Sequence, residues 1–520
     1  MKYKIKDYPE LWQKVSGMNI DELLTAVICP NYILEKQTPA RNTTCAFIHP
    51  TTKEMACKEV PAINEGRCER ALIATDLEYG TAKMIKGTVG FPSMRAVAET
   101  ADESLAYKMG VLTANEATSS GYHWTFSPCV DILGNRRNPI VSIRTAGEDA
   151  DTVLRFGGAY MRGLQDGGLI ATLKHFPGDG YSFDDQHVTT TENPLSYEEW
   201  EKSFGRVYRE LIEYGAKAIM PGHISFPSYD DIDSETGLYP PATVSKKLLT
   251  GLLRRSLGFE GIIVSDATNM TGFCGYVNLY RAMARFLEAG GDCLLFVHAT
   301  EEYISEMKKQ IAEGVLKTDT LRNRAYRMLC FSREYFEDAE HRKISEYCES
   351  DVRELAKKVT QNSVKLVRDR NDVLPFRISS QTKIAHIILA NNGVTETTCV
   401  AAYDLSERLR KKGAMVTDFA DPGPSAALKL AKSGEYDLII CSVSNEMSYG
   451  LNTVKLSGKV ARNMMNGWMK YSTPTVFISY YDPYFGDDFE APVDTLINTY
   501  GYCEYTNSVI IEKIIKERSE

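Results

Sequence analysis

The segment LKHFPGDGYSFDDQH, residues 173–187, holds an unusual number of ionisable side chains directly after the apolar run GGLIAT. It contains Lys174, His175, three aspartates and His187 within fifteen positions. Carboxylates, imidazoles and ammonium groups are the side chains that transfer protons or attack electrophilic carbon. Taken alone, Asp185, Gln186 and His187 are best explained as a polar loop tip, so the neighbouring apolar runs have to be compared.

Ionisable residues also follow four other apolar runs in the first three hundred residues. They are Asp76 and Glu78, then Asp131 with Arg144 a little later, then His223, and finally Asp266. A single Asp after a strand is more often a helix N-cap than a catalyst, and His223 alone is best explained as a structural imidazole. Asp266 is harder to explain as a cap, because IIVSDATNM places it after three β-branched residues and a serine. The joint pattern therefore favours a chemical site.

The elements that must position these residues alternate in type along the chain. Seven apolar runs, each short and continuous, have the pattern of strands buried on both faces: 23–30, 71–80, 124–132, 168–176, 216–224, 261–267 and 292–297. Helical patterns such as 197–215 and 244–258 lie between them and end in glycine. This alternation predicts a (β/α)8 barrel, with residues 1–345 as the catalytic domain. A doubly wound open sheet is the alternative, but no glycine-rich phosphate loop follows any run.

A second α/β domain is predicted over residues 376–520, after a linker at 346–375. Four further apolar runs, 383–391, 436–444, 475–482 and 494–501, are typical of parallel strands in a smaller three-layer α/β sandwich.

Composition excludes several classes of function. The net charge of −9 argues against nucleic acid or an anionic membrane as a partner. The N-terminus shows no secretion signal, no apolar run reaches the ~18 residues of a membrane helix, and the twelve cysteines form no CxxC pair, so we expect a cytoplasmic protein. His175 and His187 lie twelve positions apart without a third ligand set, so we expect no metal and no cofactor. We expect the protein to be a monomer or a homodimer.

Several motifs resemble glycoside hydrolase family 3. They are KHFPGDG…DQH, GIIVSDATNMTG, ALIATDLEYG, TFSPCVDIL…NRRNPIVSIRTAGEDADTV and IMPGHISFP. The resemblance is specific from about residue 70 to 340 and looser in the C-terminal half. It implies retaining hydrolysis of a terminal β-linked sugar, with Asp266 at the position of the nucleophile.

The acid/base divides the family into two branches, and this chain is similar to the exo-β-N-acetylglucosaminidases. That branch uses an Asp-x-His pair after Lys-His-Phe-Pro-Gly, a spacing that falls on Asp185 and His187. His187 would then protonate the leaving oxygen and deprotonate water, while Asp185 orients its ring. Gly178, Gly180 and Ser182 are expected to let this loop swing. The remaining predicted substrate-binding residues are Asp76, Arg144, Lys174, His175 and Asp131.

The predicted partner is therefore a carbohydrate, an amino-sugar glycoside or cell-wall fragment, and the favoured sugar is N-acetylglucosamine. Three alternatives stay open: a β-glucosidase with Glu446 as acid/base, a phosphorylase, and a non-catalytic sugar-binding protein. Two stretches depart from the family: DLEYGTA stands where the family has Asp-x-Glu-Gly-Gly-Arg-Val, and residues 38–68 fit no part of the pattern.

Overall fold

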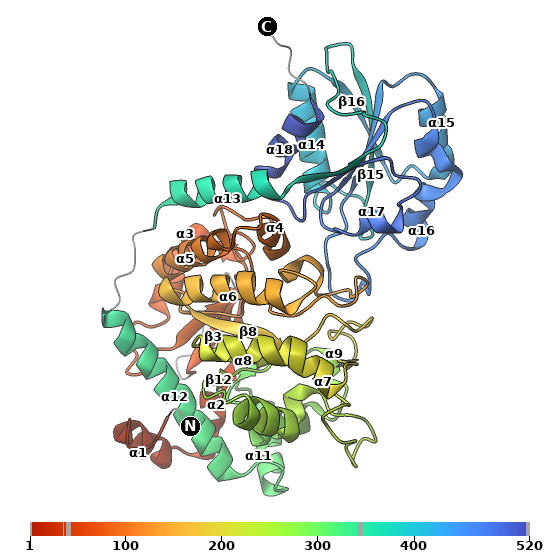
Figure 1. The fold of residues 1–520 in the computed structure, drawn as a ribbon. Helices are drawn as coiled ribbons and strands as arrows, with labels where there is room; N and C mark the ends of the chain where they lie inside the picture. Colours follow the sequence, from red (N-terminus) through yellow and green to blue (C-terminus); the bar gives the residue numbers. More distant parts are fainter. Residues whose placement is uncertain (1–2, 35, 38–42, 342–346, 516–520) are drawn as a thin grey trace. The chain divides into compact units, whose positions relative to one another are not determined.

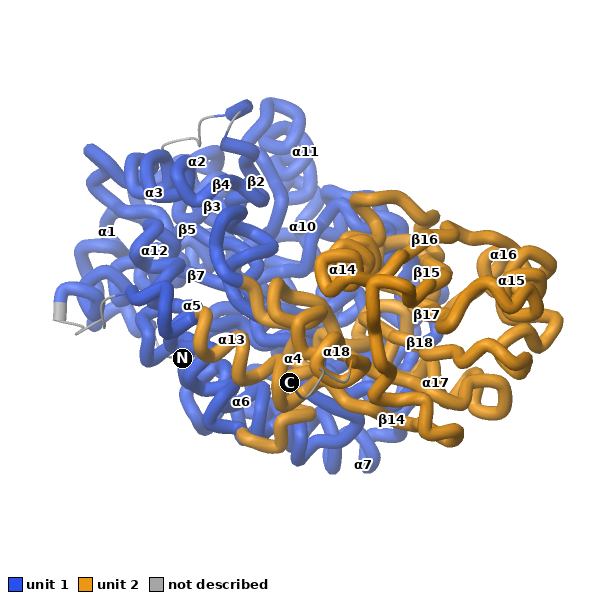
Figure 2. The backbone as a smooth tube through the Cα atoms, turned by 90° about the horizontal axis from the view of Figure 1, so that it is seen from above, with its two compact units in different colours: residues 1–89, 103–135, 145–352 blue, residues 90–102, 136–144, 353–520 orange. Residues whose placement is uncertain are grey.

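The computed structural model describes residues 3–34, 36–37, 43–341 and 347–515 (Figure 1). The chain forms two compact units, which Figure 2 shows in different colours. Unit 1 comprises residues 1–89, 103–135 and 145–352, and unit 2 comprises residues 90–102, 136–144 and 353–520. Among the described residues, every helix is too short or too polar to cross a bilayer.

Unit 1 is built on a curled parallel sheet of seven strands. Their order is β12 (Ile262–Ile263), β10 (Ala218–Pro221), β8 (Ile170–Phe176), β7 (Trp124–Thr125), β5 (Leu72–Thr75), β3 (Cys45–Ile48) and β2 (Asn31–Tyr32). A separate parallel pair joins β1 (Ile28–Cys29) to β13 (Leu294–Leu295). A bridge between Val264 and Cys293 connects the residue after β12 to the residue before β13. The shorter parallel pairs are β4 (Thr51–Thr52) with β6 (Ile85–Lys86), and β9 (Thr191–Glu192) with β11 (Ile224–Ser225).

Helices precede, separate and follow the strands of unit 1, and those between strands agree with the helical sequence patterns (Figure 1). They are α1 (Pro9–Gly17), α2 (Ile20–Ala26), α3 (Lys53–Ala62), α5 (Glu103–Ser119), α6 (Ala150–Asp166), α7 (Tyr197–Trp200), α8 (Arg206–Glu213), α9 (Thr271–Cys274), α10 (Leu279–Ala289), α11 (Glu301–Ala312) and α12 (Thr318–His341). A 3₁₀ turn, η3 (Ala242–Val244), and two π-helical segments, η2 (Glu201–Gly205) and η4 (Lys247–Ser256), complete this set.

Two strand predictions differ from the structure. The apolar run 23–30 begins inside α2, whose start is fixed by a capping box between Asn19 and Glu22, so its strand is only β1. We predicted no strand in the stretch 38–68, but it contributes β3, which lies between β2 and β5. CAFI is too short and too apolar for its periodicity to distinguish strand from helix.

Unit 2 contains a six-stranded sheet with helices on both faces. The strand order is β14 (Lys365–Asp369), β19 (Thr495–Asn498), β18 (Thr475–Ser479), β17 (Leu438–Val443), β15 (Lys383–Leu389) and β16 (Met415–Ala420). All pairs are parallel except β14 with β19. One apolar cluster packs α14 (Val400–Lys411) and α18 (Thr506–Ile514) against the sheet, and another packs α15 (Pro424–Lys432), α16 (Gly458–Ala461), η5 (Arg462–Lys470) and α17 (Phe485–Asp488). The shorter elements α4 (Met94–Glu99) and η1 (Ser142–Arg144) also belong to this unit.

The predicted linker at 346–375 has regular structure over much of its length. It includes α13 (Glu349–Ser363) and the edge strand β14. The predicted domain boundaries stay a prediction, but residues 365–369 pair within the second sheet and are not a free connection.

A buried ion cluster holds the amino-terminal ends of β12 and β13 together. Asp292, fully buried, accepts hydrogen bonds from Arg254 Nη2 at 2.6 Å and Arg327 Nε at 2.8 Å, and the backbone N–H of Ile263 donates to it at 2.9 Å. Arg324 lies 3.5 Å away. Burial would raise the pKa of the Asp292 carboxyl, but the three guanidinium groups hold it well below the usual range.

We expect Asp292→Asn to lower the free energy of unfolding by about 3–5 kcal/mol at pH 7, because it leaves buried guanidinium groups without a counter-charge. The folded-state pKa of Asp292 lies below its unfolded value, so its contribution is present at neutral pH and is lost as pH falls below about 4. Urea unfolding between pH 3 and pH 7 measures both effects, and the difference between wild type and variant should shrink at the acid end.

The matched control is Asp319→Asn, which removes the exposed pair of Asp319 with Arg322 on α12. Such pairs contribute less than about 1 kcal/mol. Equal losses in the two variants would contradict the role of the buried cluster.

Candidate active site

The carboxyl ends of neighbouring strands bring the predicted site residues of unit 1 together. β8 pairs with β10 through Met220 and Lys174, and Cys129 bridges to Lys174 from the segment after β7. Asp76 follows β5, which pairs with β7. Because these strands are parallel and adjacent, the residues that follow them meet at one edge of the sheet.

Lys174 links this edge to the end of β5. Its side chain is 5% exposed, and its Nζ lies 3.0 Å from Asp76 Oδ1 and 2.8 Å from Glu78 Oε1. Two carboxylates therefore share one buried ammonium group. The Asp76 side chain is 40% exposed, so it reaches the surface of the site while its Lys174 partner stays inside.

Asp131 is fully buried beneath His175. Its Oδ1 accepts from the backbone N–H groups of His175 at 3.1 Å and Asp179 at 2.8 Å, and its Oδ2 lies 2.7 Å from His175 Nδ1. Burial would raise the pKa of the Asp131 carboxyl, but the His175 charge and these hydrogen bonds lower it. The carboxylate is therefore engaged with the protein. The direct substrate contact that we predicted for Asp131 stays a prediction, and the structure places its two oxygens against His175 and Asp179.

Asp266, which follows β12, faces His175 across the site. Its Oδ2 lies 3.9 Å from His175 Nε2, and its Oδ1 accepts from the N–H of Ala267 at 2.7 Å. Burial would raise the pKa of the Asp266 carboxyl, but the charges of His175 and His187 and the Ala267 hydrogen bond lower it overall. Asp266 is therefore held as a carboxylate.

Asp185 and His187 form a hydrogen-bonded pair, as the Asp-x-His spacing implies. His187 Nδ1 lies 2.7 Å from Asp185 Oδ1, which also accepts from the His187 N–H at 2.9 Å. Asp185 is fully buried, whereas the His187 side chain is 21% exposed. A carboxylate can only accept, so Nδ1 carries a proton, and Nε2 lies on the side of the ring away from Asp185. His187 is close enough to Asp266 for its charge to lower the carboxyl pKa.

Two glycines of the loop between Lys174 and His187 are packed tightly, and the mobility that we predicted from them stays a prediction. A Cβ on Gly178 would lie 2.2 Å from the Phe204 ring, and one on Gly180 would lie 2.1 Å from the Ile132 carbonyl oxygen. Both residues also have positive φ angles, +125° and +112°. Glycine at these positions thus allows close approach of the backbone.

Three residues that the sequence did not assign to the site also contribute to it. Glu78 is the second partner of Lys174, and Gln186 and His223 are fully buried next to the Asp185–His187 pair. For Glu78 a signal existed, because it lies two positions after Asp76 at the same strand end. For His223 the signal was its position directly after an apolar run, and for Gln186 the sequence offered none beyond its position between Asp185 and His187.

Arg144 and Glu446 belong to unit 2, so their predicted roles stay predictions. Arg144 is buried and its Nη1 donates to the carbonyl oxygen of Ile140 at 3.4 Å, inside the same unit. Glu446 follows β17.

Among the described residues, one group of three potential metal ligands lies close together. The ligand atoms of Cys129, Asp131 and His175 are within 4.8 Å of one another. Asp131 Oδ2 already accepts from the Cys129 thiol at 3.2 Å and pairs with His175 Nδ1, so hydrogen bonding accounts for the cluster.

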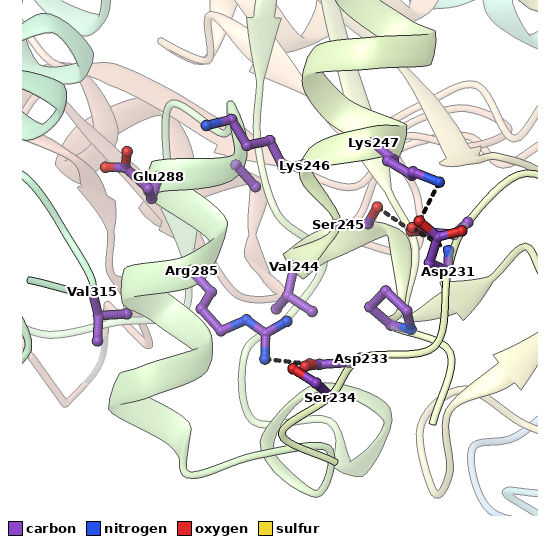
Figure 3. A pocket seen from close by; sticks show the side chains of 13 residues that line it. Asp231, Asp233, Ser234, Val244, Ser245, Lys246, Lys247, Arg285, Glu288 and Val315 are labelled. Atoms are coloured by element: carbon purple, nitrogen blue, oxygen red, sulfur yellow. Dashed lines mark hydrogen bonds and ion pairs between the residues drawn. The ribbon is translucent and has the colours of Figure 1, made fainter. Parts of the chain in front are cut away.

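A surface pocket of about 440 Å³ lies elsewhere on unit 1, between the loop that follows β11 and α10 (Figure 3). Its charged side chains are largely paired with each other, Arg285 with Asp233 at 2.6 Å and Lys247 with Asp231 at 2.6 Å. It contains none of the predicted site residues, so the chemistry does not belong there.

Residues 49–331 match the model of the glycosyl hydrolase family 3 N-terminal domain. A β-N-acetylglucosaminidase/β-glucosidase of Cellulomonas fimi is 31% identical over 468 residues, which cover 85% of this chain and 80% of that protein. A β-hexosaminidase of Pseudomonas aeruginosa PAO1 is 34% identical over 230 residues, which cover 43% of this chain and 64% of that protein.

Two solved structures extend the likeness over nearly the whole chain. A β-glucoside phosphorylase is 27% identical with a TM-score of 0.86, covering 98% of this chain and 94% of that one. A family 3 β-N-acetylglucosaminidase from Paenibacillus sp. FPU-7 is 20% identical with a TM-score of 0.78, covering 95% and 96%, and so shares the fold. Three observations agree: the match to the family model, the Cellulomonas fimi relative, and the sheet edge at which Lys174, His175 and Asp266 meet. The chain belongs to glycosyl hydrolase family 3, a family of glycoside hydrolases.

Proposed function

We propose that this protein is a retaining exo-β-glycosidase that releases a terminal β-linked N-acetylhexosamine, with N-acetylglucosamine as the favoured sugar. The observation that carries the proposal is that a carboxylate and an imidazole, which differ in protonation state, lie close together. Asp266 is a carboxylate whose pKa is lowered by neighbouring imidazoles, and His187 is an imidazole hydrogen-bonded to the buried Asp185. Two groups with distinct protonation states are what double displacement at an acetal requires.

In the first step, Asp266 Oδ2 attacks the anomeric carbon as the glycosidic bond breaks. His187 starts as an imidazolium, which the Asp185 carboxylate stabilises, and passes its Nε2 proton to the leaving oxygen. The products are a glycosyl ester on Asp266 and a free alcohol. In the second step, His187 Nε2 takes a proton from water as the water oxygen attacks the same carbon, which restores both Asp266 and the imidazolium.

An imidazole as acid/base suits a site that must keep its nucleophile ionised. A carboxyl acid/base that had lost its proton in the free enzyme would put a second negative charge beside Asp266 and would raise the pKa of the nucleophile. His187 is neutral when it has lost its proton, so it never places a negative charge beside Asp266.

We propose that the sugar is bound by Lys174, Asp76 and His175. Carboxylate acceptors beside an ammonium donor can bind neighbouring hydroxyls, and Lys174 with Asp76 supplies this combination. The buried Asp131 fixes the His175 ring by its Nδ1, so that Nε2 points toward Asp266 and the reacting carbon. Arg144 is proposed as a further contact.

We further infer a (β/α)8 barrel followed by a smaller three-layer α/β sandwich. The parallel ladder from β2 to β12 continues through the Val264–Cys293 bridge to β13 and β1, which supports closure of the barrel. Separate apolar clusters on the two faces of the second sheet support the sandwich.

Phosphorolysis is the second candidate function, and it rests on the 27% identical β-glucoside phosphorylase. In that reaction inorganic phosphate attacks the glycosyl ester in place of water. A neutral His187 would repel the phosphate anion less than a carboxylate would.

Asp266→Ala should reduce hydrolysis of 4-nitrophenyl β-N-acetylglucosaminide by at least about 10⁴-fold, because no glycosyl ester can form. Intact-mass spectrometry of wild type with a slow fluorinated substrate should show a covalent sugar that the variant lacks. Wild-type turnover without any covalent adduct would contradict the double displacement.

His187→Ala should lose about 10²–10⁴-fold on an alkyl glycoside but much less on a 2,4-dinitrophenyl glycoside, whose leaving group needs no proton. Glu446→Gln is the matched comparison and should leave both rates near wild type. The reverse pattern would identify Glu446 as the acid and support a β-glucosidase.

Added inorganic phosphate distinguishes the two reactions. Hydrolysis predicts an unchanged rate with phosphate and a free sugar as the only sugar product. A rate that rises with phosphate, with a sugar 1-phosphate detected by ³¹P NMR, would replace hydrolysis with phosphorolysis.

A further inference from the structure

His223 lies at the end of β10 with every polar group engaged. Its backbone N–H donates to Gln186 Oε1 at 2.9 Å, its Nδ1 lies 3.1 Å from Thr243 Oγ1, and its Nε2 lies 3.0 Å from the Ala267 carbonyl oxygen. The residue is fully buried. These contacts reach three segments that are far apart in the sequence.

The partners determine the tautomer of the ring. The carbonyl oxygen of Ala267 can only accept, so Nε2 must carry the proton. Nδ1 is then the acceptor, and the Thr243 hydroxyl in η3 donates to it. Burial lowers the pKa of His223, so the ring keeps the neutral form that this arrangement needs.

The two loops that His223 contacts carry the proposed acid/base and the proposed nucleophile. Gln186 lies between Asp185 and His187, and its Nε2 is 3.5 Å from Asp179 Oδ2. Ala267 follows Asp266, and its N–H holds the Asp266 carboxylate at 2.7 Å. His223 therefore contacts the immediate neighbour of each reacting group.

Close backbone packing keeps these loops against His223. A Cβ on Gly272 would lie 2.6 Å from the Gln186 carbonyl oxygen and 2.9 Å from His223 Cβ. The backbone N–H of Thr271 also donates to the His187 carbonyl oxygen at 3.0 Å. The loop after Asp266 and the loop that ends at His187 thus touch each other, and both contact His223, the first through its ring and the second through its backbone N–H.

We propose that His223 is a positioning residue that fixes the separation between His187 and Asp266 by binding both of their loops at once, with Thr243 setting its orientation. The proposal rests on the proposed function. His223 does not reach the substrate. It acts by holding Gln186 and Ala267, so its loss displaces both reacting groups together.

Hydrogen–deuterium exchange tests the coupling without reference to activity. In His223→Phe, the segments 183–192 and 264–274 should both exchange about tenfold faster than in wild type. The variant loses the ring bond to Ala267, and the segment 183–192 is bound to the loosened loop through Thr271 and to the backbone of residue 223. His123→Phe is the matched control: His123 lies before β7, accepts from the Ile73 N–H at 3.0 Å and packs against Phe336. It should leave both segments unchanged.

Kinetics give the second readout. His223→Phe should lower kcat about 10²-fold on both the alkyl and the dinitrophenyl glycoside, because displacement of Asp266 slows attack whatever the leaving group. Thr243→Val should show a smaller loss on both substrates, and Thr243→Ser, which keeps the hydroxyl, should restore the rate.

The outcomes are distinguishable. Faster exchange in only one segment, or a rate loss confined to the alkyl glycoside, would overturn the coupling. Failure of wild type to cleave any glycoside would overturn the proposed function, and the exchange comparison of His223→Phe with His123→Phe would still decide whether His223 joins the two loops.

Discussion

The site depends on parallel strands that end at a common edge. The register of β8 against β10, together with the bridge from Cys129 to Lys174, fixes which residues leave the sheet beside each other. In a parallel arrangement, side chains that follow successive strands face one another without any direct connection along the chain. Lys174 and Asp76 are 98 positions apart, yet they lie within hydrogen-bonding distance.

Two buried carboxylates of unit 1, Asp292 and Asp266, are stabilised by different kinds of neighbour. Asp292, before β13, is surrounded by guanidinium groups, which are charged at neutral pH. Asp266, after β12, lies among the imidazoles of His175, His187 and His223, a type of side chain that can take up and release a proton. A permanent counter-charge suits a structural cluster. Titratable neighbours suit a site that has to transfer protons while one carboxylate stays ionised.

Hydrogen bonds from buried residues orient the side chains of the proposed catalytic groups. Asp131 orients His175, Asp185 orients His187, and His223 holds the loops on either side of the site. In each case a buried acceptor fixes one ring nitrogen and thereby directs the other. The fold thereby determines which ring nitrogen of each of these histidines carries the proton. The names of the similar proteins include glucosidase, hexosaminidase and phosphorylase, so proteins that resemble this chain carry out more than one reaction.

Local motifs with fixed spacing were enough to predict the family, the order of apolar runs and the positions of Asp266, Lys174, His175 and the Asp185–His187 pair. The structure was needed to find that β3 enters the sheet from the stretch 38–68 and that the Asp131 carboxylate binds His175. It was also needed to find that Glu78 and His223 lie beside these residues. The physical reason is that burial and hydrogen-bond partners come from strands tens of residues away, and no local pattern records which distant atoms a side chain will meet.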